Sequence, residues 1–73
     1  MDRAMLEDHL RLAIEHVAEG EQHVQNLGAV LARLEEGGHD TTEAKRLLAQ
    51  FEELQAMHGA DRDRLLRELG DRD

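Results

Sequence analysis

Apolar or small residues in the first half of the chain recur at alternating steps of four and three residues. This spacing is the heptad pattern of a helix that packs along one side against another helix. Because the stepping continues without a slip for about eight helical turns, it excludes a strand in this half of the chain. The positions are Leu6, Leu10, Ala13, Val17, Gly20, Val24, Leu27, Leu31 and Leu34.

A single break at Gly37-Gly38 separates this stripe from a second one. Paired glycines end a helix, and we expect Asp40 to cap the next helix with Glu43 as its capping-box partner. The second stripe is less regular because two of its positions, His58 and Asp61, are polar. It comprises Ala44, Leu47, Phe51, Leu54, His58, Asp61, Leu65 and then Glu68 or Leu69.

These two stripes predict an all-α fold with helices at about 3–36 and 41–69, joined by a turn at 37–40 within one domain, 1–73. So short a connection makes the helices antiparallel, as a helical hairpin. Ala, Glu, Lys, Leu and Arg supply 40 of the 73 residues, a composition typical of long helices. Further apolar residues lie outside the stripes, so we expect the hairpin to dimerise into a four-helix bundle: Leu12, Ile14, Val30, Leu48, Met57 and Leu66.

Size and charge narrow the classes of partner. A core in a chain below about 70 to 80 residues rarely supplies more than roughly 3 to 5 kcal/mol, so a metal or a partner chain is expected, and the absence of Cys excludes disulfides. The net charge of -8 argues against nucleic acid and favours cations. The first residues lack the basic and apolar segments of a signal peptide, and no stretch resembles a membrane span. We therefore expect a cytoplasmic protein with no membrane partner.

Histidines mark one flank of the first helix. His9, His16 and His23 recur every seven residues, so neighbours in this row lie about 10 Å apart, too far to share a metal ion. Chelation on a helix needs steps of three or four residues, which relate Glu19 to His16 and to His23.

The polar positions of the second stripe are expected to meet this row. If the turn places Leu34 opposite Ala44, then His58 lies opposite Gly20 and Asp61 lies opposite His16. Gly20 lacks a side chain and leaves space for an imidazole, a metal ion or a small ligand. The sequence therefore predicts a cluster that binds a divalent transition metal such as Zn or Mn: His16, Glu19, His23, His58 and Asp61.

The sequence allows three hypotheses for the role of this cluster. In the first, the protein is a self-associating hairpin that binds a metal. In the second, it is a metal-dependent hydrolase of esters or phosphoesters, in which the metal activates a water and Glu19 or Asp61 acts as general base. In the third, His58 and Asp61 form a polar layer that fixes helix register in a scaffold without a site.

Several segments resemble a group of very short uncharacterised proteins of soil proteobacteria. The resemblance extends from about residue 9 to 66 and implies a small natural helical hairpin, with no activity to transfer. It is carried by 16–23 (HVAEGEQH), 38–44 (GHDTTEA), Leu47-Leu48, Phe51-Glu52, His58 and 61–65 (DRDRL).

Overall fold

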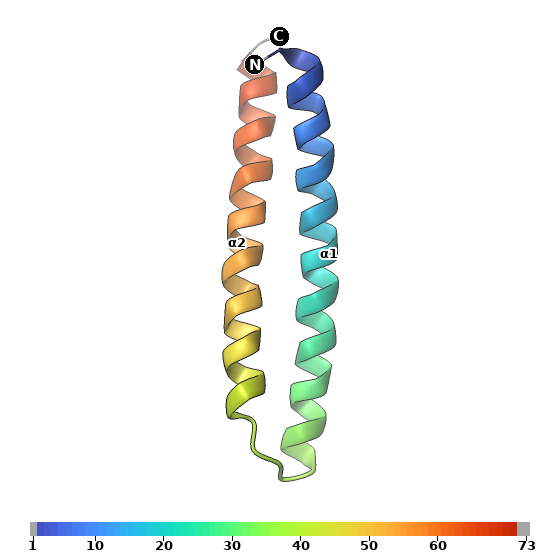
Figure 1. Cartoon of the computed structure of the whole chain (residues 1–73), viewed down its shortest axis with the longest axis vertical. Coiled ribbons are helices and arrows are strands. Elements are labelled where there is room, and N and C mark those ends of the chain that lie inside the picture. The colour runs from blue at the N-terminus through green and yellow to red at the C-terminus, as the bar shows by residue number, and fades with distance from the viewer. Residues whose placement is uncertain (1, 72–73) are drawn as a thin grey trace.

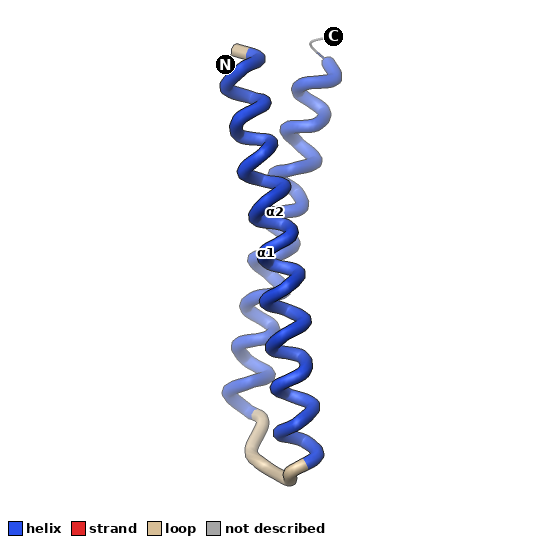
Figure 2. Tube along the Cα trace, turned by 90° about the vertical axis from the view of Figure 1, so that its right-hand side faces the viewer, coloured by secondary structure: helices blue, strands red, loops and turns tan. Residues whose placement is uncertain are grey.

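The chain forms an antiparallel pair of long helices, α1 (Arg3–Glu36) and α2 (Thr42–Asp71) (Figure 1). The computed structural model describes residues 2–71, and this part of the chain contains no strand. The molecule is a rod of 55 × 14 × 14 Å whose helices cross at a shallow angle (Figure 2). The predicted helical hairpin is confirmed. Within residues 2–71, neither helix is long and apolar enough to span a membrane.

The paired glycines end α1 in a Schellman motif. The amide of Gly38 donates to the carbonyl of Glu35 at 3.1 Å, and the amide of His39 donates to the carbonyl of Leu34 at 2.9 Å. These bonds require a left-handed residue between them, and Gly38 has a φ of 72°. The second glycine of the pair is therefore the residue that lets the chain reverse direction.

Asp40 lies one residue before the N-cap of α2, which is Thr41, so its predicted role as the capping residue was wrong. Its Oδ1 accepts hydrogen bonds from the backbone amide of Thr42 at 3.0 Å and from the Thr42 hydroxyl at 2.8 Å. This is an Asx turn just outside the helix, because the Thr41 carbonyl accepts the first helical backbone bond. Glu43 forms an ion pair with Arg46 at 3.0 Å, so its predicted reciprocal role was wrong.

The hydrogen bonds that Asp40 accepts make the stability of the fold depend on pH in the acid range. The hydrogen bonds from the amide and hydroxyl of Thr42 hold the pKa of the Asp40 carboxyl below its ordinary value of 3.8. A pKa lowered by folding stabilises the folded chain above the unfolded value, and this contribution is lost as pH falls through the lowered one. At pH 6 we expect the Asp40→Ala variant to have a lower melting temperature than the unchanged chain. This gap in melting temperature should begin to shrink near pH 3.8 and close as pH falls through the lowered pKa. Thermal melts across this range check it; a constant gap would contradict it.

The apolar stripe of α1 faces α2 as predicted. Leu6, Ala13 and Val17 are buried, and the remaining stripe positions are half-buried. Leu6 and Ala13 form a cluster with Leu65 and Leu69 near the end of the rod opposite the turn. The best-packed part of the interface therefore lies at the end of the rod where α1 begins and α2 ends.

The stripe of α2 runs in a different phase from the predicted one. Leu47, Leu54 and Asp61 are exposed, so their assignment to the interface was wrong. The observed stripe steps from Ala44 to Leu48, four residues on, whereas the predicted stripe stepped from Ala44 to Leu47, three residues on. Because residues 47 and 48 are both leucine, periodicity alone does not distinguish the two phases. The buried or half-buried positions in this phase are Ala44, Leu48, Phe51, Gln55, His58, Arg62, Leu65 and Leu69, and Gly59 beside them is also half-buried.

Two glycines make a matched test of the backbone conformation. Gly28 lies inside α1, where an added Cβ would meet nothing within 4 Å, so Gly28→Ala is expected to stabilise the fold by about 0.5 to 1 kcal/mol. Gly38 has the left-handed φ, so Gly38→Ala is expected to destabilise it by about 1 to 2 kcal/mol. Urea unfolding at one chain concentration measures both changes. Shifts of the same sign would contradict the turn geometry.

Candidate functional site

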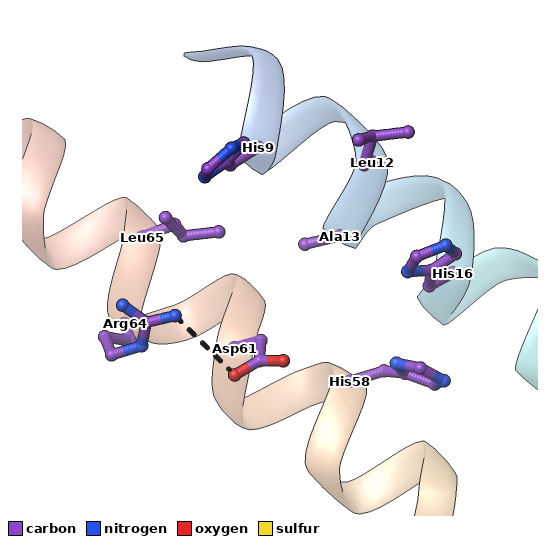
Figure 3. A pocket seen from close by; sticks show the side chains of 8 residues that line it. All are labelled: His9, Leu12, Ala13, His16, His58, Asp61, Arg64 and Leu65. Atoms are coloured by element: carbon purple, nitrogen blue, oxygen red, sulfur yellow. Dashed lines mark ion pairs between the residues drawn. The ribbon is translucent and has the colours of Figure 1, made fainter. Parts of the chain in front are cut away.

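One side of the hairpin carries two adjacent hollows between the helices. We call this side the histidine face, because His16 and His58 border both hollows. Figure 3 shows the hollow nearer the termini, with His16 projecting from α1 and His58 from α2. Its lining is His9, Leu12, Ala13, His16, His58, Asp61, Arg64 and Leu65. The other hollow is lined by His16, Glu19, Gly20, His23, Phe51, Leu54, Gln55 and His58.

The closest approach of two predicted ligands is between His16 and His58. Their ring centroids lie 5.1 Å apart with an angle of 44° between the planes. Two imidazoles on one tetrahedral zinc ion, with Zn–N bonds of about 2.0 to 2.1 Å, have centroids about 5 Å apart. Within residues 2–71, neither ring has a hydrogen bond, and His16 is exposed to solvent. The pair therefore has the spacing of two ligands to one metal ion.

The two predicted carboxylates lie on the same face, one turn away from this pair. Glu19 follows His16 by three residues and has no ion pair or hydrogen bond within residues 2–71. Asp61 follows His58 by three residues and forms an exposed ion pair with Arg64 at 3.7 Å, drawn as a dashed line in Figure 3. Asp61 was expected opposite His16 across the interface; instead His58 takes that place.

His23 lies apart from the pair. It stands one heptad beyond His16 on α1, and its ring stacks on Phe51 with centroids 5.7 Å apart and planes 18° apart. Within residues 2–71, no three His, Asp or Glu side chains come close enough together to hold a metal ion. A single hairpin thus brings two of the five predicted ligands into contact and leaves the others on the same face.

Gln55, rather than His58, fills the space left by Gly20. A Cβ on Gly20 would overlap the Gln55 side-chain amide, whose Nε2 donates to the Val17 carbonyl at 2.8 Å. The Gln55 Oε1 is buried without a partner among the described residues. The gap predicted for an imidazole or a metal is therefore occupied by a glutamine. The sequence contained the signal, since Gln55 follows Phe51 by four residues, but a polar residue is not expected at an apolar stripe position.

Exposed apolar side chains collect on the histidine face. Leu12 and Leu54 border its hollows, and Met5, Val30, Leu47 and Met57 lie seven residues from positions that do. A step of seven returns to nearly the same side of a helix. Within residues 2–71 these six make up most of the eight large apolar side chains that are exposed. The other two, Ile14 and Leu66, lie in heptad step with Glu21 and Glu52, which border a hollow on the opposite side. The histidine face is therefore the more apolar side of the rod.

Comparison with known proteins returned no match: the chain matches no protein-family model, no curated protein and no solved structure.

Proposed function

We propose that this protein is a structural and interaction module that works as a homodimeric four-helix bundle, with the histidine faces of two hairpins packed together. The observation that carries the proposal is the collection of six exposed apolar side chains on this one face. Exposed apolar side chains gathered on one face mark an interaction site on a small protein. Within residues 2–71, the opposite side of the rod exposes two large apolar side chains, Ile14 and Leu66.

The exposed area of the hairpin is large enough to include an interface with a second hairpin. The hairpin exposes 5336 Å², whereas a compact monomer of the same mass would expose about 4,600 Å². The excess of about 700 to 800 Å² is close to the roughly 800 Å² per partner of a standard protein interface. One face of the 55 × 14 Å rod supplies an area of this order. A single rod lying along another would therefore cover the surplus.

A second copy is the occupant that the pattern favours. His9, His16, His23 and Val30 step by seven along α1, and Leu47, Leu54 and Asp61 step by seven along α2. These rows share the seven-residue period of the α1–α2 interface, so two such faces can align along their length. The small core also favours association with another chain. Five apolar residues are buried within residues 2–71, and a chain of this length is expected to need a partner.

Sedimentation equilibrium of the unchanged chain between about 1 and 100 µM tests the proposal. We expect the mass of two 8.3 kDa chains, measured in a buffer with chelator and again in one with zinc. A folded monomer of helical circular dichroism in both buffers would overturn the proposal.

A further inference from the structure

We infer that the two hairpins complete a divalent transition-metal site between them, with His16 and His58 from one copy and Glu19 and His23 from the other. This inference rests on the proposed dimer. It distributes four of the five residues of the cluster expected within one chain over two equivalent sites related by a two-fold axis, and it leaves out Asp61, which pairs with Arg64.

The intrachain pair supplies half of a site. His16 and His58 have the separation of two imidazoles on one metal ion, at 5.1 Å between centroids. A zinc ion takes four ligands, and within residues 2–71 no third His, Asp or Glu joins the pair. The chain's own His23 lies about 10 Å further along the same helix, by the rise of seven residues, and stacks on Phe51. The chain's own Glu19 lines the same hollow as the pair but does not join it, so we take the further protein ligands from another chain.

The symmetry of the dimer brings such ligands to the pair. We place the two-fold axis in the plane of contact and across the helices, so that α1 of each copy lies antiparallel to α1 of the other. Full overlap of the rods puts the axis at the middle of Arg3–Glu36, between residues 19 and 20. Residues equally far on either side of this point then face each other. His16 faces the partner's His23, and the partner's Glu19 lies one turn away.

The same axis places Glu19 close to the partner's Glu19, because residue 19 of one copy faces residue 20 of the other. Like charges buried together are costly. The crosswise axis also brings Arg33, near the turn, to the end of the partner that holds Asp71.

A cation also offsets the burial of Glu19. This carboxylate has no ion pair or hydrogen bond within residues 2–71, and a carboxylate buried in an interface needs a partner of opposite charge. Each chain carries a net charge of -8, so the dimer repels itself and gains from a bound cation. Imidazole together with carboxylate selects Zn and similar transition metals over Mg or Ca. Zinc is the probe we choose.

Complementation between two variants tests the shared site. One variant carries His16→Ala and His58→Ala, and the other carries Glu19→Gln and His23→Ala. The unchanged dimer is expected to bind one zinc per chain in equilibrium dialysis, and each variant alone to bind at least about 10-fold more weakly. After equal mixing and equilibration, half of the dimers contain one chain of each kind. Each of these has one intact site, so binding should return to about a quarter of the original capacity.

The controls separate failure of the site from failure of the dimer. His39→Ala, at an exposed position in the turn and outside the histidine face, should keep full zinc binding. His16→Ala alone, at an exposed position, replaces the double variant if that variant does not fold by circular dichroism. Dimers in sedimentation with no zinc regained on mixing would overturn the shared site and leave the dimer standing. Full binding by the Glu19→Gln and His23→Ala variant would also overturn the shared site, whereas monomers throughout would overturn both proposals.

Discussion

Leu6→Ala is expected to leave the hairpin largely unfolded at physiological temperature. Leu6 is the only side chain in residues 2–71 that is fully buried, at 0% exposure, and it packs with Leu65 and Leu69. Truncating a buried leucine to alanine costs about 2 to 5 kcal/mol. The whole core of so short a chain supplies roughly 3 to 5 kcal/mol, so this one cavity removes most of the stability. Urea and thermal unfolding followed by circular dichroism measure the loss.

Ile14→Ala is the matched control for this prediction. Ile14 also lies in α1 but is 49% exposed and is on the side opposite the histidine face. Exposed substitutions of this kind usually change stability by about 0.5 kcal/mol or less. Equal losses in the two variants would show that the cluster at the open end of the rod does not hold the helices together.

Leu54→Glu is expected to dissociate the dimer. Leu54 is 47% exposed, borders the hollow that contains His16 and His58, and lies near the middle of the histidine face. In the proposed bundle the new carboxylates are buried without a partner, a cost of about 3 kcal/mol or more. The dissociation constant should therefore rise by about 100-fold or more. Sedimentation at several concentrations measures the shift.

Leu66→Glu provides the comparison for Leu54→Glu. Leu66 is a leucine of the same helix with 49% exposure, but it lies on the other side of the rod. Its substitution adds the same charge and should leave the association unchanged. If Leu66→Glu dissociates the dimer and Leu54→Glu does not, then the two hairpins associate through the face that lacks the histidines.

The first helix and the turn were predictable because local patterns determine them. The stripe of α1 admits one phase only, since each step of four or three residues reaches an apolar or small residue and all of these positions are buried or half-buried. Gly38 and Asp40 act through hydrogen bonds to residues within five positions in the chain. Such local geometry is encoded by residue type and spacing.

The candidate site was only partly predictable because it depends on the pairing of the two helices. The sequence placed His16, Glu19 and His23 on one flank of α1, and the structure keeps them there. The expected opposition of His58 to Gly20 was wrong by three residues, as Gln55 takes that position. This shift brings His58 to His16 and leaves Asp61 exposed beside Arg64. A change of register moves every cross-helix contact at once.

The sequence by itself determined two long helices, their antiparallel order and the side of α1 that faces its neighbour, because heptad spacing and the Gly-Gly turn act within one helix or one reversal. Only the tertiary structure decided which leucines of α2 enter the interface. Leu47 and Leu48 are equally apolar, so periodicity allows both phases. Packing distinguishes them: the chosen phase half-buries Leu48, buries Leu69 and sets the Gln55 amide against Gly20, where a Cβ would collide.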